Sequence, residues 1–402
     1  MISSGEGKNI NAKNLSLGCR VNFSKMKKSF LIFDFLFLCI LCFSSFAFGF
    51  HDYETLAIGS KAPDFNLPGI DGKNYTLESF KDEKVLVIAF ICNHCPTSQA
   101  YEERLIKLTS DYADKGVKVV AINPNNPASL RYDELGWSDV GDSFDDMKVR
   151  AREKHFNFPY LYDGETEITS RKYGPVSTPH IFIFDKDRIL RYNGRIDDME
   201  NPHKTPHSSD ARNAIDALLN NKVVPVDVTK VFGCSIKWLE KSDWMEKAAI
   251  QWAKEPVTLD AIGISGITDL LKNNSDKLRL INVWATWCGP CTTEFSDFVT
   301  LSRIYKERDF EFISISADDP ENKDKALKFL KNKQSSGTNY LFGEDDKYKL
   351  IEAIDPLWQG ALPYTLLVEP GGKIVYSKQG AIDAEELRKI IFNDSYIGRL
   401  YK

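Results

Sequence analysis

The chain has 402 residues, of which 43% are hydrophobic and 27% charged, as in an ordinary soluble globular protein. This length predicts two or three domains. A net charge of -5 and a pI near 5.8 favour no nucleic-acid partner, and we expect none. Eight cysteines are too few for a disulfide scaffold, and those that occur as Cys-x-x-Cys pairs favour redox chemistry.

The N-terminus has the pattern of an export signal. A basic stretch at 25–28 precedes an apolar run from Phe30 to Phe50 that ends in small residues. The run is nearly long enough to span a bilayer, so an uncleaved anchor is the alternative, although Asp34 would be costly in hydrocarbon. We assign residues 1–50 to a signal peptide or membrane anchor with an upstream extension. The remainder is then extracytoplasmic, whether periplasmic, secreted or membrane-anchored.

Residues 51–225 alternate between strand and helix patterns, as expected for an α/β domain. A turn at 69–73 separates two short strands. The apolar run from Lys84 to Phe90 has the length of a central strand and leads to Cys92 and Cys95. We expect further strands at 117–122, 159–162, 181–185 and 188–192, helices at 97–115, 144–155 and 211–220, and a loop insertion at 123–143.

Three motifs characterise this part of the chain. They are Gly-Ser-Lys-Ala-Pro-Asp-Phe at 59–65, Asn-His-Cys-Pro at 93–96 and Gly-Cys-Ser-Ile-Lys-Trp at 233–238. Together they resemble the AhpC/TSA-related redoxins, a branch of the peroxiredoxin and thioredoxin-fold superfamily. The resemblance implies dithiol chemistry, for which we expect Cys92 as the nucleophile and Cys95 as the resolving thiol. Relatives often carry a further cysteine where this chain has Ser177, so Cys234 is either a substitute resolving thiol or an inert buried cysteine.

His94 lies between the two cysteines, and we expect its imidazole to stabilise the Cys92 thiolate and lower its pKa. Peroxiredoxins place a hydroxyl three residues before the reactive cysteine, whereas here those positions are Ala89 and Cys92. Disulfide exchange is therefore favoured, and a thiol peroxidase recycled by a fused reductant domain is the first alternative. The second alternative is a metal-binding protein or metallochaperone that uses Cys92, Cys95 and the histidines of His203–His207. That loop is rich in Pro and Lys, so we expect no metal.

Residues 226–256 connect the two halves of the chain. Ile236 to Lys254 has the periodicity of an amphipathic helix and carries Trp238, Trp244 and Trp252. We expect these tryptophans to pack against one or both domains rather than to bind a ligand.

Residues 257–402 repeat the order of the first half. An apolar strand at 278–284 leads to Cys288 and Cys291, and a helix follows. A helix N-terminus favours a thiolate, so Cys288 is the expected nucleophile and Cys291, about one turn later, the resolving thiol. We expect further strands near 258, at 310–317, 340–342, 361–368 and 373–376, and helices before 271 and at 292–307, 320–333, 347–354 and 384–392.

The segment Trp-Cys-Gly-Pro-Cys at 287–291 closely resembles the active site of thioredoxin, and its lead Trp-Ala-Thr-Trp-Cys resembles the extracytoplasmic thiol reductases of the TlpA/ResA-like family. In that fold a cis proline lies against the dithiol, and the residue before it presents backbone groups to a partner. The resemblance assigns these positions to two pairs of residues, Thr178 with Pro179 and Leu362 with Pro363.

Three residues around the second dithiol have expected roles. Asn282 replaces the buried aspartate that serves proton transfer in thioredoxin. Glu294, one turn after Cys291, is either a replacement general base or a solvated helix residue. Trp287 is expected to shield the rim of the site.

We therefore expect two thioredoxin-like three-layer α/β/α sandwiches with central mixed β-sheets. The expected activity is that of an exported thiol–disulfide oxidoreductase acting on protein disulfides through two dithiols. No cofactor is expected beyond the redox-active disulfides. The expected partners are protein thiols and disulfides and an upstream electron donor such as a membrane thiol reductase.

Overall fold

The computed structural model describes residues 53–398 and 400. The export segment expected at 1–50, with Cys19, Cys39 and Cys42, lies outside the described residues. Within the described part of the chain, none of the helices combines the length and the apolar character that crossing a bilayer requires.

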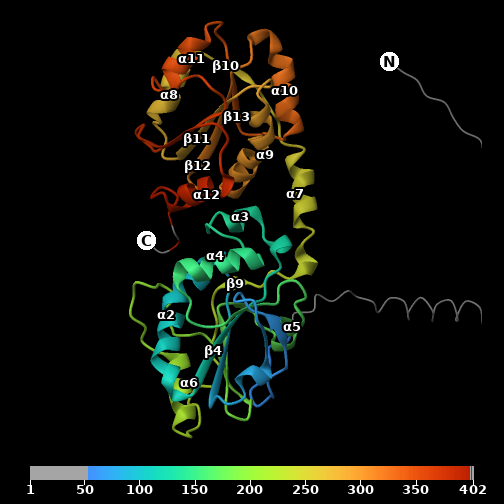
Figure 1. Ribbon diagram of the computed structural model, residues 1–402, viewed down its shortest axis with the longest axis vertical. Coiled ribbons are helices and arrows are strands. Elements are labelled where there is room, and N and C mark those ends of the chain that lie inside the picture. Colours follow the sequence, from blue (N-terminus) through green and yellow to red (C-terminus); the bar gives the residue numbers. More distant parts are fainter. Residues whose placement is uncertain (1–52, 399, 401–402) are drawn as a thin grey trace, which may run out of the picture. The chain divides into compact units, whose positions relative to one another are not determined.

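The first domain is built on a sheet with the strand order β5-β4-β3-β7-β8 (Figure 1). The strands β3 (Val85–Phe90), β4 (Val117–Asn123) and β5 (Tyr160–Tyr162) run parallel to one another. β7 (His180–Phe184) and β8 (Leu190–Gly194) complete the sheet in antiparallel pairing. Every residue of β3 is buried, and alternate side chains enter the cores on the two faces, which confirms the expected central strand.

The two faces of this sheet are covered differently. One core contains side chains from α2 (Pro96–Tyr112), α4 (Phe144–Lys154) and α6 (Asp210–Leu219). The opposite core contains Tyr173 of α5 (Ile168–Tyr173), a helix that the sequence patterns did not indicate. It is completed by the 3-10 turn η1 (Leu77–Phe80) and by the expected hairpin, β1 (Asn66–Pro68) with β2 (Asn74–Thr76). The expected helix at 97–115 is α2 extended by η2 (Ala113–Lys115), and the expected loop at 123–143 contains η3 (Pro127–Ser129) and α3 (Tyr132–Leu135).

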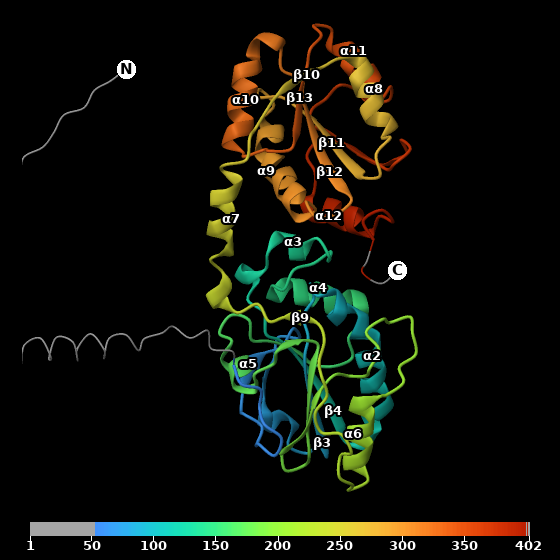
Figure 2. The ribbon, with the colours of Figure 1, turned by 180° about the vertical axis from the view of Figure 1, so that it is seen from behind.

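The second domain has the same strand arrangement with one strand added at the edge, in the order β10-β13-β12-β11-β14-β15. These strands are β10 (Asp260–Ile262), β11 (Leu278–Trp284), β12 (Phe310–Ser316), β13 (Thr338–Phe342), β14 (Tyr364–Val368) and β15 (Ile374–Gln379). On one face lie α9 (Gly289–Ile304), α10 (Lys323–Asn332), preceded by η5 (Pro320–Asn322), and α12 (Ala384–Asn393) (Figure 2). On the other lie α8 (Ile264–Lys272) and α11 (Lys347–Ile354), so this domain is the expected three-layer sandwich.

The prediction of a single connector helix from Ile236 to Lys254 is wrong. The helix α7 covers only Trp244–Trp252, after the turn η4 (Leu239–Lys241). The preceding residues lie extended on the first domain, where β9 (Cys234–Ser235) pairs with β6 (Ser177–Thr178). Ile236 and Trp238 are buried there, and this burial outweighs their helical periodicity.

The connector tryptophans pack as expected. The Trp244 indole donates a hydrogen bond to the carbonyl of Ala128 in the first domain. Trp252 stacks on Tyr132 and lies beneath the guanidinium of Arg303 on α9. They therefore contact both domains.

Candidate active sites

The second dithiol lies at the junction between β11 and α9. Cys288 is the N-cap residue of α9, and its sulfur accepts the backbone N–H of Cys291 at 3.3 Å. Cys288 and Cys291 are joined by a disulfide. Trp287, the residue before Cys288, is 67% exposed and forms an apolar surface next to the disulfide.

Asn282, which replaces the thioredoxin aspartate, and Glu294, the candidate general base, are both buried. The amide of Asn282 donates to the Thr365 hydroxyl at 3.1 Å. Glu294 is 5% exposed, which shows that its interpretation as a solvated helix residue is wrong. One carboxylate oxygen of Glu294 accepts the backbone N–H of Ile382, and the other, Oε1, has no hydrogen-bond partner among the described residues. Burial raises the pKa of Glu294 to about 7.

Both expected prolines follow cis peptide bonds, at Thr178-Pro179 and Leu362-Pro363. In each domain the residue after the cis proline begins an antiparallel strand that pairs with the central strand. His180 lies opposite Phe90 in the first domain, and Tyr364 lies opposite Val283 in the second. Phe90 and Val283 are therefore equivalent positions, and the residues that follow them can be aligned one by one.

This alignment shows that the two Cys-x-x-Cys pairs occupy different places in the fold. Three pairs of positions are equivalent: Cys95 with Cys288, Ser98 with Cys291, and Cys92 with Ala285. The hydrogen bonds agree, because Cys95 is the N-cap of α2 and its sulfur accepts the Ser98 N–H at 3.4 Å. The roles expected for the first pair are thereby corrected: the position favourable to a thiolate belongs to Cys95 and not to Cys92.

The thiols of this site have opposite tendencies to ionise. Burial raises the pKa of Cys95, but hydrogen bonds from the thiols of Cys234 and Cys92 and the charge of His94 outweigh it, so the pKa lies well below its usual range. Burial and the hydrogen bond with Cys95 raise the pKa of Cys92. The expectation that His94 lowers the pKa of Cys92 is wrong, because the thiolate that His94 stabilises is that of Cys95.

Cys234 lies against this thiolate. Its backbone N–H donates to the Cys95 sulfur at 3.4 Å, and it pairs with Thr178 across the short β6–β9 ladder. The Cys95 sulfur lies 3.4 Å from the Thr178 carbonyl oxygen, and the Thr178 hydroxyl lies 2.9 Å from the Cys92 sulfur. The structure thus brings three thiols to the cis-proline loop of the first domain.

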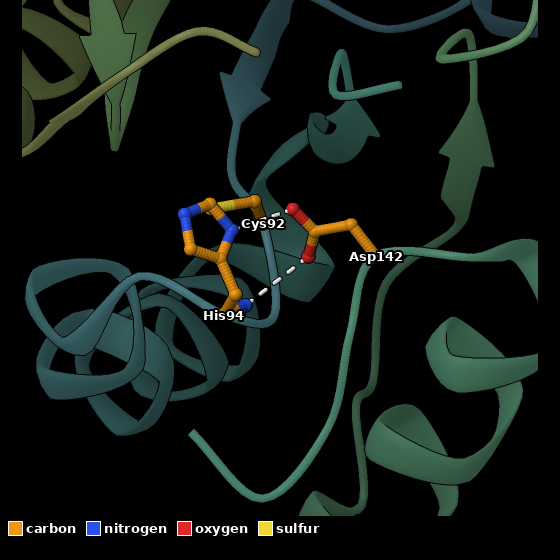
Figure 3. A group of neighbouring side chains, drawn as sticks. All are labelled: Cys92, His94 and Asp142. Carbon is orange, nitrogen blue, oxygen red and sulfur yellow. Dashed lines mark hydrogen bonds and ion pairs between the residues drawn. The ribbon is translucent and has the colours of Figure 1, made fainter. Parts of the chain in front are cut away.

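Sequence reasoning missed Asp142, which reaches this site from the stretch interpreted as a loop. One of its carboxylate oxygens accepts the backbone N–H groups of Asn93 and His94 at 2.7 and 3.1 Å. The other lies 2.6 Å from Nδ1 of His94 (Figure 3). It also accepts the Asn125 amide at 2.7 Å. A lone aspartate in a polar stretch carries no sequence signal for this role.

Asp142 and His94 form a buried ion pair. Burial lowers the pKa of His94, but the adjacent carboxylate outweighs it, and the resulting pKa is raised. Burial likewise raises the pKa of Asp142, and His94 with the N–H donors brings it below its usual value. The positive charge next to Cys95 therefore depends on a side chain that is distant in the sequence.

The histidines proposed as metal ligands are not assembled with the thiols. His207 is exposed and lies 3.6 Å from Asp198. Within the described residues, the side chains of metal-ligand type that gather at this site are those of Cys92, His94 and Asp142, with ligand atoms within 4.8 Å of one another. Because each Asp142 oxygen already accepts two N–H donors, this group is organised as a hydrogen-bonded His–Asp pair.

Replacing Asp142 with asparagine should lower the free energy of unfolding of the first domain by about 3 kcal/mol, because it leaves a buried histidine without its counter-charge. Urea denaturation measures the change. Asp145→Asn is the control, because that side chain is 90% exposed and pairs with Lys148 at the surface. Equal losses in the two variants would contradict a stabilising role for the buried pair.

The loss of unfolding free energy caused by Asp142→Asn should depend on pH. The pKa of His94 is raised above its ordinary value of 6.5. The ion pair's contribution is therefore fully present just below pH 6.5 and is lost as the pH rises through the raised pKa. The pKa of Asp142 is lowered, so the contribution also disappears in strong acid. The difference between Asp142→Asn and the unmodified chain should thus be largest in mildly acidic solution.

Comparisons with known proteins agree with this tandem arrangement. Residues 58–193 match the AhpC/TSA family, and residues 265–391 match the Redoxin family. The thiol-disulfide oxidoreductase ResA of Bacillus thuringiensis subsp. konkukian is 27% identical over 168 residues, which cover 40% of this chain and 86% of that protein. ResA of Bacillus anthracis is 30% identical over 142 residues, covering 35% and 78%.

Among solved structures, an uncharacterized conserved protein from Geobacillus kaustophilus is 39% identical, with a TM-score of 0.41, and the match covers 46% of this chain and 94% of that chain. The residues of the two sites, the two family matches and the ResA relatives lead to one assignment. The chain belongs to the ResA-like thiol-disulfide oxidoreductases and carries an AhpC/TSA domain and a Redoxin domain in tandem.

Proposed function

We propose that this protein is an exported oxidoreductase that exchanges electrons with the disulfides of other proteins. The observation that carries the proposal is the Cys288–Cys291 disulfide at the N-cap of α9, beside an exposed tryptophan. A disulfide next to an apolar surface suits an extended or unfolded protein segment as the partner. The apolar N-terminal segment within residues 1–50 supports export, by a cleaved signal or a membrane anchor.

The chemistry proposed for the second domain uses three side chains. In the reduced protein, the Cys288 thiolate attacks a substrate disulfide and forms a mixed disulfide. Cys291 then attacks the Cys288 sulfur, which releases the reduced substrate and restores the Cys288–Cys291 disulfide. Glu294 lies three residues after Cys291 on α9, on the same helix face, and its unpartnered Oε1 is suited to accept the Cys291 proton. An upstream dithiol donor, such as a membrane thiol reductase, would return the site to the reduced state.

A second candidate function concerns the first domain, whose match to the AhpC/TSA family favours a thiol peroxidase. Cys95 is fully buried and its pKa is lowered, which suits a small oxidant better than a folded protein. Hydrogen peroxide consumption in the presence of dithiothreitol tests this function. A peroxidase should lose its activity on Cys95→Ser substitution and retain it on Cys288→Ser substitution, whereas unchanged consumption after Cys95→Ser would exclude Cys95 as the reacting thiol.

Substituting Cys288 with serine should lower the rate of insulin disulfide reduction by at least about 100-fold, because it removes the attacking sulfur. Cys291→Ser is the matched variant. It keeps the nucleophile, so it should accumulate a mixed disulfide with insulin that mass spectrometry detects. Insulin reduction that persists in Cys288→Ser would place the reaction elsewhere in the chain.

Glu294→Gln should alter the dependence of the insulin reduction rate on pH. With a pKa of about 7, the carboxylate becomes a proton acceptor as the pH rises through neutrality, so the rate should rise over that range. The glutamine variant should lose this rise and be slower at pH 8 by about 100-fold, the low end for general base catalysis. Glu307→Gln, an exposed carboxylate beyond the end of α9, is the control. An identical profile in Glu294→Gln would remove Glu294 from the mechanism.

A further inference from the structure

The first domain lacks a cysteine at the position where the second domain holds its resolving thiol. Ser98 occupies the place of Cys291, one turn into the helix. Its hydroxyl accepts the backbone N–H of Cys92 at 3.1 Å. A sulfur that resolves a mixed disulfide on Cys95 must therefore approach from another direction.

The position of Cys92 is that of a core residue. Its equivalent in the second domain, Ala285, is fully buried. Cys92 itself is 2% exposed, and its sulfur lies against the Thr178 hydroxyl. Burial raises the pKa of Cys92 whereas the pKa of Cys95 is lowered, so Cys92 stays protonated beside the Cys95 thiolate. Cys92 is thus placed to stabilise Cys95.

Cys234 also contacts Cys95, through its backbone N–H, and is only partly buried. The segment 229–237, called the tail below, carries Cys234 and is held in place before and after this residue. Upstream, the Thr229 hydroxyl lies 2.7 Å from the Tyr192 hydroxyl. Downstream, the backbone N–H of Lys237 donates to Asn125 at 2.9 Å. These anchors keep Cys234 next to Cys95, and because Cys234 is only partly buried, it is the cysteine that a reductant in solution reaches most readily.

Gly233 determines how closely this tail approaches the cis-proline loop. Its φ of +146° is one that residues with a side chain rarely adopt, and a Cβ at this position would lie 2.0 Å from the Thr178 carbonyl oxygen. Because that oxygen belongs to the backbone, it cannot move aside as a flexible side chain would. The tail can therefore lie against Thr178 only with glycine at this position.

We propose that Cys95 and Cys234 form the redox-active pair of the first domain, with Cys92 acting as a positioning thiol. The proposal deepens the proposed thiol–disulfide exchange by naming the reacting pair. The Cys95 thiolate attacks one sulfur of a disulfide, forms a mixed disulfide and expels one thiolate. Cys234 then attacks the Cys95 sulfur, the Cys95–Cys234 disulfide forms, and the second half of the substrate leaves as a thiol with the Cys234 proton. The substrate gains two electrons, and the two cysteines lose them.

The experiment uses the full chain with Cys288→Ser and Cys291→Ser, so that only the first site reacts. The reduced protein is treated with oxidised glutathione, free thiols are alkylated, and disulfide-linked peptides are identified by mass spectrometry. The expected product links Cys95 to Cys234. In addition, Cys234→Ser should accumulate glutathione on Cys95, while Cys92→Ser should still form the Cys95–Cys234 bond. A Cys92–Cys95 disulfide as the main product would overturn the proposal.

A variant that keeps every thiol tests the geometry. Gly233→Ala should displace the tail and lower the rate of Cys95–Cys234 bond formation by about 10-fold. Gly72→Ala is the matched control, because that glycine also has a positive φ but a Cβ there would meet nothing within 4 Å. Equal rates in the two variants would contradict a role for the tail. Insulin reduction by the unmodified chain tests the proposed function separately, so either idea can fail alone.

Discussion

Both sites depend on the pairing between the central strand and the antiparallel strand that follows the cis proline. This pairing places Phe90 and Val283 at equivalent positions, and a fixed number of residues later the chain enters a helix. The sulfur at that entry accepts a backbone N–H in both domains, at 3.4 and 3.3 Å. A thiol elsewhere in the same motif has no access to these N–H groups, so the pairing register decides which cysteine becomes the thiolate.

The reactive cysteines of the two domains have equivalent positions in the fold but different surroundings. In the second domain the disulfide lies beside an exposed tryptophan, and burial raises the pKa of the Glu294 carboxylate. In the first domain the thiolate is buried and is stabilised by two thiols and by a histidine that Asp142 keeps charged. The second domain thus places its disulfide beside an exposed apolar side chain, whereas the first encloses a preorganised anion.

Much of the architecture could be predicted because the strands are strongly patterned. The fully apolar run at β3 and the mostly apolar run at β11 indicate central strands, and their positions relative to the cysteines indicate strand-to-helix junctions. The connector was mispredicted because its apolar spacing resembles that of a helix, whereas Ile236, Lys237 and Trp238 are all buried in an extended segment. Contacts with the first domain, which no local pattern contains, select the extended conformation.

The sequence by itself determined the two domains, their α/β class, both cysteine pairs and the prolines that precede the late strands, because each of these is encoded in local spacing and hydrophobic periodicity. Only the tertiary structure decided the roles of the cysteines in the first domain. Cys95 rather than Cys92 caps α2, Cys234 is brought to it across 139 residues, and Asp142 reaches His94 across 48. These contacts follow from strand pairing and burial, which bring distant residues together without any signal in their neighbours along the chain.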